Sequence, residues 1–440
     1  MSRILGCARD TLLLSFSAVS EEVKQIYSPR TLGFFVCIIL LYKIYNLIKY
    51  NKCLPPGPYG YPVLGMIPII KKDFHLQLFD YTKDFGKIFS LKMGSQLMVV
   101  LSDHKLIKAA FGKSDFAAKP QVEFLNFLDG RGELINILTA EQSNIIICSL
   151  GIINAEGKLW KNQRRFLHQQ KFGMKHWGVG SEQLEARVSQ EVHYFLNAIR
   201  QEEKNPINPA PMLNCAVSNV ICSMIMSTRF KHNDQKFKRF MHLFDEGFRL
   251  FSMTGYMMFL PVLKHLPGTH DTLKALEANR EEMLEFVQFI IKEHKTSLDT
   301  ESPRDLVDSY LIEIENAKET GNFDIFDSID PEKQLEQIIL DIFSAGVETI
   351  KTTLQWAILF MIHEPEVRKK VQAELAGVVE ADRLPSMEDM PHLPYTRATI
   401  YEVMRRSTVV PLGTTHRTIR CVAASSNDPN LTLILSLQDC

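Results

Sequence analysis

The sequence predicts a mainly helical protein that contains a small β-sheet region and is preceded by a membrane-anchor helix. Three observations support this prediction. A segment that starts at Asp330 continues to His363 without a helix breaker, two β-rich segments flank Gly94, and an apolar run occupies residues 32–48. The chain has 440 residues, 45% of them hydrophobic, which is enough to bury one large core.

The composition argues against nucleic-acid binding and against a zinc or disulfide framework. The formal net charge is −1, so the chain has no general attraction for a phosphate backbone. The eight cysteines include no Cys-x-x-Cys pair, and we interpret them as reduced thiols of a cytosol-facing protein. No Pro-, Gly- or Ser-rich linker divides the chain into separate cores.

The apolar run at 32–48 is interpreted as the membrane anchor, and residues 1–31 before it have no assigned role. The run reaches the roughly 17–25 residues of a spanning helix only if Lys43 extends toward the lipid headgroups. Lys49 and Lys52 follow it, which places its C-terminal end in the cytosol. A cleaved signal peptide and a buried core helix are the alternatives.

Residues 54–62 read Leu-Pro-Pro-Gly-Pro-Tyr-Gly-Tyr-Pro and cannot form a helix. Each proline removes a hydrogen-bond donor and fixes φ. A stiff, extended hinge directly after an apolar helix suits a catalytic domain that is tethered to a membrane. The hinge therefore argues against the core-helix alternative.

The next predicted elements are a hairpin and a short helix. Segments 88–93 and 97–101 are rich in β-forming residues and flank a Gly-Ser turn, which is typical of a hairpin. Ser102 or Asp103 then caps a helix that runs through Ala110.

Further along the chain the pattern is mostly helical. An amphipathic stretch opens at Asp271 and continues to about Lys295. Asp330 is a good N-cap because Pro331 follows it at the first helical position, and nothing breaks this helix until Pro365. At 1.5 Å per residue the helix spans roughly 50 Å, so it must cross the centre of a large domain.

Two segments do not fit the pattern around them. Residues 131–150 separate Phe-Leu-Asp-Gly from Gly-Ile-Ile-Asn, and a connection with some 20 extra residues is uncommon unless it is functional. Residues 421–440 match no expected element. We interpret the first segment as a foreign insertion and the second as an aberrant tail, with translated intron sequence as one origin for both.

The centre of the long predicted helix reads Ala-Gly-Val-Glu-Thr at 345–349. A glycine inside a helix costs about 0.5–1 kcal/mol relative to alanine, so Gly346 needs a reason. One reason is close approach of a ligand to Ala345 and Gly346, while Glu348 and Thr349 hold a water and deliver protons to bound oxygen. The alternative is that both small residues permit close helix packing and Thr349 bonds back to a carbonyl.

Three other polar groupings are candidates for a site. Trp160 and Arg164 are four residues apart, so an indole N–H and a guanidinium on one helix face offer donors to a carboxylate, and His416 is a third candidate donor. Glu402 and Arg405 are three apart and form either a buried organising pair or a solvated surface pair. Taken alone, Trp160, Arg164 and His416 also fit plain structural roles.

In this order the motifs resemble those of the cytochrome P450 family. The series is an anchor, a Pro-rich hinge, Trp-x-x-x-Arg, Ala-Gly-x-Glu-Thr, Glu-x-x-Arg and Pro-x-x-x-x-His. The resemblance runs from about Leu54 to about Arg420, apart from 131–150. It implies that residues 63–420 form a partial domain of the cytochrome P450 fold, incomplete at its C-terminal end.

The resemblance also implies an activity. The chain would be a haem-thiolate monooxygenase of the endoplasmic reticulum membrane, with its catalytic domain facing the cytosol. The cofactor would be haem b, and NADPH–cytochrome P450 reductase would supply electrons from NADPH. No nucleic acid is implied as a partner.

Site residues follow from the matching motifs. The resemblance places Trp160, Arg164 and His416 at the haem propionates. It assigns proton delivery to Glu348 and Thr349, in the oxygen-site helix that contains Ala345 and Gly346.

The resemblance also bears on the proximal core and on the residue that follows Thr349. The resemblance makes the pair of Glu402 and Arg405 the structural lock of the proximal core. Ile350 stands where most relatives have Thr or Ser, which is a mild departure.

Within the family, segments 216–230, 342–356 and 406–416 most resemble insect ecdysteroid 26-hydroxylases, which inactivate moulting hormone by oxidising its side chain. A steroid is therefore the expected substrate. An apolar steroid pocket suits a stripe of aromatic residues and methionines, although core packing and contact with the bilayer fit it better: Phe248, Phe251, Met253, Met257, Met258 and Phe259.

One family motif has no counterpart. Family members carry a Phe-x-x-Gly-x-x-x-Cys-x-Gly loop whose cysteine thiolate binds the haem iron, and none of the eight cysteines has such surroundings. Cys421 and Cys440, the only ones after Glu402, lie in the tail. No metal ligand is assigned, and the sequence is expected to be truncated before this loop. The alternative function is a haem-free, catalytically inactive product of such a gene.

Overall fold

The computed structural model describes residues 54–120, 150–170, 182–418 and 432–435, apart from residues 95, 203–204, 232, 261, 264–265 and 328. The chain divides into two compact units, Gly57–Ile419 with Asn430–Cys440, and Met1–Pro56 with Arg420–Pro429. All elements below belong to the first unit. The predicted anchor at 32–48 and most of the predicted insertion at 131–150 lie outside the described residues, and no described helix combines the length and apolarity needed to cross a bilayer.

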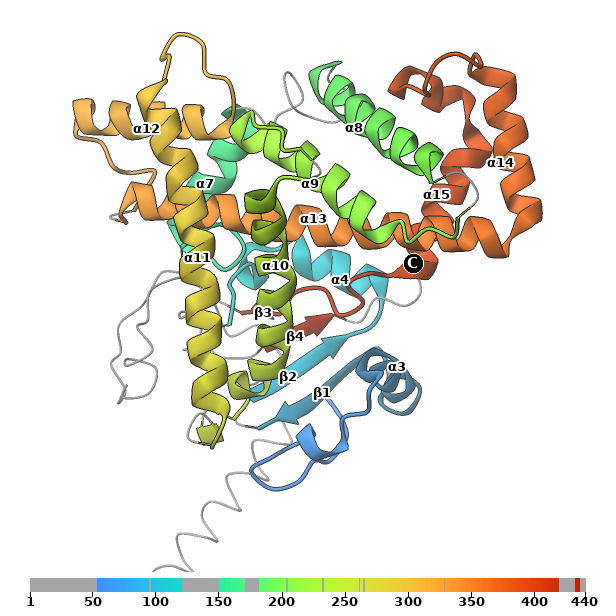
Figure 1. The fold of residues 1–440 in the computed structure, drawn as a ribbon. Helices are drawn as coiled ribbons and strands as arrows, with labels where there is room; N and C mark the ends of the chain where they lie inside the picture. Colours follow the sequence, from blue (N-terminus) through green and yellow to red (C-terminus); the bar gives the residue numbers. More distant parts are fainter. Residues whose placement is uncertain are drawn as a thin grey trace, which may run out of the picture. The chain divides into compact units, whose positions relative to one another are not determined.

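The described unit is mainly helical with one small sheet (Figure 1), as predicted. Its helices are α3 (Phe74–Phe85), α4 (His104–Phe111), α7 (Gly157–Gln170), α8 (Glu182–Gln201), α9 (Ala210–Met226), α10 (Gln235–Thr254), α11 (Thr269–Thr296), α12 (Leu306–Thr320), α13 (Pro331–His363), α14 (Pro365–Val378) and α15 (Pro394–Ser407). Short 3₁₀ turns are η1 (Ile67–Ile69), η2 (Ser114–Phe116), η3 (Gly255–Met258) and η5 (Met387–His392). The strands are β1 (Ile88–Met93), β2 (Gln96–Leu101), β3 (His416–Arg417) and β4 (Thr432–Leu435).

The four strands form one sheet in the order β1-β2-β4-β3 (Figure 1). The predicted hairpin is confirmed: β1 and β2 pair antiparallel, with Phe89 opposite Val100. Strand β4 pairs parallel with β2 and antiparallel with β3. The prediction that residues 421–440 match no element of the fold is wrong at β4. The reason is that Thr-Leu-Ile-Leu at 432–435 brings a short β-forming run to the other edge of β2.

Several predicted helices are confirmed at their ends. Asp103 caps α4 by accepting hydrogen bonds from two backbone N–H groups of the first turn. Asp330 does the same for α13, which starts at Pro331 and ends at His363 as predicted. The next helix, α14, opens at Pro365. These ends follow from local capping chemistry, which needs no distant partner.

The long helix α13 forms the core with α9, α10, α11 and α12. Its first half is buried, and the Phe343 ring lies 5.0 Å from the ring of Phe240 and 4.9 Å from that of Phe244. From Ile350 onward the apolar side chains of α13 are more exposed, and the exposed ones are Ile350, Leu354, Trp356, Leu359 and Ile362.

Helices α14 and α15 pack on each other beside the second half of α13. The carboxylate of Glu374 on α14 accepts hydrogen bonds from the backbone N–H groups of Tyr395 and Thr396, at 2.9 and 2.6 Å. Because the first N–H groups of a helix have no partner within the helix, this contact caps α15 from a neighbouring element. It fixes the helix that carries Glu402 and Arg405.

Candidate active site

A cluster of polar side chains forms where residues 116–119 meet strand β3. The Nδ1 of His416 donates to the carbonyl oxygen of Phe116 at 2.8 Å. Its Nε2 lies 3.3 Å from the Nζ of Lys119, and Lys119 donates to the hydroxyl of Thr414 at 3.0 Å. The ring of Phe111 covers the His416 ring at a centroid distance of 4.6 Å.

The electrostatics of this cluster favour an anion. Burial lowers the pKa of Lys119 to about 8, and burial together with the nearby ammonium lowers the pKa of His416. Among the described residues, no salt bridge joins either side chain to a carboxylate. A lysine that is taken out of water without a counter-charge has a strong preference for an incoming carboxylate or phosphate. Lys119 was not a sequence candidate, because a single lysine before a proline carries no motif.

An ion pair connects this cluster with the start of α7. The guanidinium of Arg417 binds the carboxylate of Glu156 at 3.0 and 2.9 Å, and its Nε donates to the backbone carbonyl of Lys119 at 3.2 Å. Glu156 directly precedes α7, the helix that carries Trp160 and Arg164. Residues 261 positions apart in sequence therefore hold β3 against the helix with the Trp-x-x-x-Arg motif.

Trp160 and Arg164 lie on one face of α7, as predicted. The Arg164 guanidinium lies 5.2 Å from the centre of the Trp160 ring, which is a cation–π geometry. Trp160 is half-buried and Arg164 is exposed. No hydrogen bond within the described part of the chain uses the indole N–H of Trp160 or the guanidinium of Arg164.

A buried carboxylate fixes the loop that leads into α7. Asp341 on α13 accepts hydrogen bonds from the backbone N–H groups of Ile152 and Ile153, at 2.7 and 3.0 Å, and from the Gln337 amide at 2.9 Å. These three hydrogen bonds lower the pKa of Asp341, but burial raises it by more, so the net shift is upward. A Cβ at Gly151 would lie 2.2 Å from the Asp341 carboxylate, so only glycine fits there.

The Ala-Gly-Val-Glu-Thr segment sits in the middle of α13. The Thr349 hydroxyl donates to the carbonyl of Ala345 at 2.7 Å, and Ala345 itself is exposed. A Cβ on Gly346 would lie 2.9 Å from the end of the Ile221 side chain on α9. The back-bond of Thr349 and the close contact at Gly346 are what the helix-packing alternative predicts for this segment.

Glu348 has different partners from its neighbour in sequence. Its carboxylate forms a salt bridge with Lys351 and accepts a 3.3 Å hydrogen bond from the Thr352 hydroxyl. The acid and the Thr349 hydroxyl are therefore not hydrogen-bonded to each other in this structure. A proton can pass between them only through an intervening water or after a change of rotamer.

Glu402 and Arg405 form a two-contact ion pair on α15, with both N–O distances at 2.7 Å. Their side chains are 52% and 51% exposed. Within the described part of the chain, this is the solvated surface pair and not the buried organising pair. Such exposed pairs contribute at most about 1 kcal/mol.

The aromatic and methionine stripe between α10 and η3 does not line one surface. Met257 is buried, whereas Phe248 and Met253 are about half exposed. Phe259 packs on the core of the hairpin. These positions agree with the two alternatives to substrate contact, core packing and an exposed apolar surface.

The described residues offer two thiols, Cys215 and Cys222, both on α9. Burial raises the pKa of Cys215 to about 11 and that of Cys222 well above its usual value, so both are protonated at neutral pH. A haem iron is bound by thiolate, which neither provides. The Lys119 ammonium beside His416 therefore fits the carboxylate side of a haem, and no described residue fits its axial sulfur.

One buried cluster has metal-like spacing and a structural explanation. His294, Asp305 and Asp308 place their ligand atoms within 4.8 Å of one another. However, Nε2 of His294 bonds Asp305 at 2.9 Å, and the Arg304 guanidinium bonds Asp308 at 2.7 and 2.9 Å. These polar groups are satisfied by one another, and they join the end of α11 to the start of α12.

A family model for cytochrome P450 matches residues 55–423. This match covers most of the sequence, and the chain belongs to the cytochrome P450 family. Cytochrome P450 18a1 of Drosophila melanogaster is 42% identical over 421 residues, which cover 94% of this chain and 75% of the relative. Human cytochrome P450 2C8 is 32% identical over 86% of this chain and 72% of its own, and mouse cytochrome P450 2J5 is 34% identical over 83% and 68%.

Membership defines the class of chemistry. The family consists of monooxygenases, so the protein is an oxidoreductase of this class. The family implies a haem cofactor, electrons from a reductase and an organic substrate.

Proposed function

We propose that this protein is a haem-thiolate monooxygenase that hydroxylates a steroid of the ecdysteroid type, with O₂ and electrons that a reductase supplies from NADPH. Family membership supports the reaction class. The observation that carries the cofactor proposal is the desolvated Lys119 beside His416, which has no carboxylate partner among the described residues. The proposed location is the endoplasmic reticulum membrane, with residues 32–48 as the anchor.

Four side chains are assigned to the haem carboxylates. Lys119 offers charge from the β3 side, where His416 gains a free N–H when its Nε2 is protonated, because Phe116 holds its Nδ1–H. Trp160 and Arg164 offer donors from α7. The ion pair between Arg417 and Glu156 keeps these two sides together. Charge-assisted hydrogen bonds of this kind are roughly twice as strong as neutral ones.

Haem bound through a cysteine thiolate would supply the chemistry that places one oxygen atom of O₂ into a C–H bond. The protein must then deliver protons without admitting bulk water. We assign this step to the Thr349 hydroxyl, which gives up its bond to the Ala345 carbonyl and donates outward. Glu348, on the same turn, leaves Lys351, takes a proton from solvent and passes it through a water to the Thr349 oxygen, which restores the hydroxyl.

The steroid assignment rests on sequence. The three segments at 216–230, 342–356 and 406–416 resemble ecdysteroid 26-hydroxylases. The second of them contains Ala345, an exposed small residue on α13 that leaves room for a bulky ligand.

A specific observation favours a second function. The 440 residues contain no Phe-x-x-Gly-x-x-x-Cys-x-Gly loop, and the described thiols are held protonated by burial. The second proposal is that these 440 residues form a haem-free, catalytically inactive product of the same gene.

Spectroscopy of the purified chain distinguishes the two proposals. The chain is expressed with haem precursor, reduced and exposed to carbon monoxide. A strongly red-shifted Soret band, which reports thiolate ligation, supports the monooxygenase and rules out the second proposal. Bound haem without that shift, or no bound haem, rules out the monooxygenase for these 440 residues. The variant Lys119→Gln should lower haem retention about tenfold, whereas the exposed control Lys113→Gln should not.

A further inference from the structure

The Lys119 amine has a second chemical capacity besides binding an anion. Its Nζ has two acceptors among the described residues, the hydroxyl of Thr414 at 3.0 Å and the Nε2 of His416 at 3.3 Å. A neutral amine has two N–H bonds and one lone pair, whereas an ammonium has three N–H bonds and no lone pair. The two acceptors therefore match the neutral form, whose lone pair has no partner among the described groups.

The hydrogen bonding of His416 makes its Nε2 a base toward this amine. The Nδ1–H donates to the carbonyl oxygen of Phe116 at 2.8 Å, so a neutral ring carries its lone pair on Nε2. Burial and the nearby ammonium lower the pKa of His416, which keeps the ring neutral at pH 7. The other charged groups of the cluster, Arg417 and Glu156, bind each other. His416 is therefore the group that can exchange protons with the Lys119 amine.

Lys119 combines a desolvated amine with access for a small molecule. Burial lowers its pKa to about 8. At pH 7.5 about a quarter of the amine is then neutral, compared with about one part in a thousand for an ordinary lysine. Thr414 is exposed, and the Phe111 ring that covers His416 is 46% exposed. Within the described part of the chain, a small carbonyl compound can reach the amine along this apolar ring.

We propose that Lys119 is a nucleophile that captures small apolar aldehydes as imines, with His416 as its proton-transfer partner. An apolar aldehyde suits the site because the amine is uncharged when it attacks and the exposed Phe111 ring offers apolar surface. The step uses neither haem nor O₂, so it stands apart from the proposed monooxygenase reaction.

The two N–H protons of the amine account for the reaction. The Nζ lone pair attacks the carbonyl carbon, and the C=O electron pair moves onto oxygen. His416 carries one proton from Nζ to that oxygen and then a second from Nζ to the resulting hydroxyl, which leaves as water while the C=N bond forms. One amine and one aldehyde give one imine and one water, and no oxidant or reductant is consumed.

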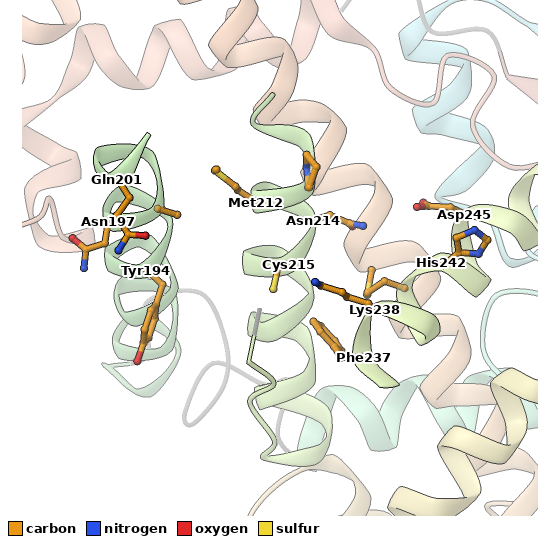
Figure 2. Close-up of a pocket in the computed structure, with 13 residues that line it drawn as sticks. Tyr194, Asn197, Gln201, Met212, Asn214, Cys215, Phe237, Lys238, His242 and Asp245 are labelled. Carbon is orange, nitrogen blue, oxygen red and sulfur yellow. The ribbon is translucent and has the colours of Figure 1, made fainter. Parts of the chain in front are cut away.

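Lys238 is a matched control because it has room for a ligand but a different environment. It lines a groove of about 700 Å³ between α8, α9 and α10 (Figure 2). This volume falls within the roughly 300–1,000 Å³ of small-molecule sites. The Lys238 side chain is exposed, and Asp245 lines the same groove. Exposed lysines are charged at neutral pH, so space alone should not make this amine react.

Reductive trapping measures the imine directly. The full 440-residue chain, expressed without haem precursor, is mixed with hexanal and cyanoborohydride at pH 7.5, and peptide mass spectrometry gives the alkylation rate of each lysine. Lys119 should react at least about 20-fold faster than Lys238 and the exposed Lys113. Its neutral fraction is about 200-fold larger than that of an ordinary lysine, and a weaker base is about tenfold less nucleophilic.

The pH dependence tests whether a neutral amine is responsible. Between pH 6 and 9 the Lys119 amine passes through its titration, while exposed lysines stay almost wholly charged. The ratio of the Lys119 rate to either control rate should therefore fall about tenfold over this range. The speed of the reducing agent cancels in this ratio.

His416→Asn tests the proton transfer. The Asn amide can still donate to the Phe116 carbonyl, but it presents no nitrogen lone pair to the amine. At pH 9, where the amine is mostly neutral, the Lys119 rate should fall about tenfold. The rates of Lys113 and Lys238 should not change, and circular dichroism checks the fold of the variant.

Three outcomes would overturn the proposal. They are alkylation of Lys119 no faster than that of the two control lysines, a rate ratio that stays constant from pH 6 to pH 9, and an unchanged Lys119 rate in His416→Asn. The first two are measured in the parent chain, so they decide the matter whether or not the variant folds.

Discussion

Lys119 determines what the candidate active site attracts. Its ammonium is desolvated and shares the site with His416 rather than with an acid. In a protein without a bound anion, such a charge opposes folding. In a protein with a carboxylate bound there, the same charge contributes to affinity. A lysine that is costly to folding and has no carboxylate partner among the described residues is a functional candidate with a physical reason.

The cost of Lys119 gives a pH-dependent prediction. Its pKa falls from 10.5 to about 8 on folding, so the charged form is disfavoured in the folded state. Below pH 8 both states are charged and the folded chain carries the full cost. From pH 8 to 10.5 the folded state loses its proton first, and stability rises. Lys119→Met should therefore stabilise the haem-free chain by about 1–3 kcal/mol at pH 7, with the gain gone near pH 10.5.

Urea unfolding of the parent and variant chains across this pH range measures the difference. Comparing the two chains cancels other groups that titrate there. Lys113→Met, at an exposed lysine close in sequence, should give no pH-dependent difference. A gain from Lys119→Met that stays constant up to pH 10.5 would mean that packing, not charge, is responsible.

At the scale of elements, local chemistry made the helix ends and the hairpin predictable. Asp330 and Pro331 specify the start of α13 with two neighbouring residues, and the Gly-Ser turn specifies the hairpin with two more. The cationic site could not be predicted in the same way. Lys119 lies beside His416 and Thr414, 297 and 295 residues away in sequence, and the ion pair of Arg417 with Glu156 spans 261 residues, so no local pattern encodes these contacts.

The packing of α13 on α9 tests the reason for Gly346. Alanine normally stabilises a helix by about 0.5–1 kcal/mol over glycine, but here its Cβ would lie 2.9 Å from Ile221 Cδ1. Gly346→Ala should therefore give little or no gain in the parent chain. An Ile221→Val background lacks that terminal carbon. There, Gly346→Ala should recover most of the stability that alanine normally gives a helix over glycine. Chemical unfolding of the four chains of this double-mutant cycle measures the coupling. Additive effects would show that packing does not explain the glycine.

The junction of α11 and α12 should respond to pH. Burial lowers the pKa of His294, but its hydrogen bond and charge interaction with Asp305 outweigh burial, so the net shift is upward. A raised folded pKa means that the pair stabilises fully below about pH 6.5, the unfolded value, and less as pH rises through the folded value. His294→Gln should thus destabilise more at pH 5.5 than at pH 9. Thermal unfolding at both pH values measures this, and equal losses would contradict the charge assignment.

At the scale of the whole molecule, the core and the sheet lie within a single compact unit that starts at Gly57. A chain that begins there keeps every helix and strand described above. Its free energy of unfolding should therefore differ from that of the full chain by no more than about 0.5 kcal/mol. What it loses is the apolar run at 32–48, the proposed anchor.

Flotation with phospholipid vesicles separates the two possible sources of membrane binding. If residues 32–48 are the anchor, the full chain should float with the vesicles and the chain from Gly57 should stay in solution. The shortened chain still exposes Tyr59, Tyr61, Val63 and Leu64, at 94%, 58%, 76% and 41%. Flotation that persists unchanged after shortening would therefore assign membrane contact to this exposed apolar surface and show that binding does not require residues 32–48. Replacing Tyr59 and Val63 with serine in the shortened chain would then abolish flotation.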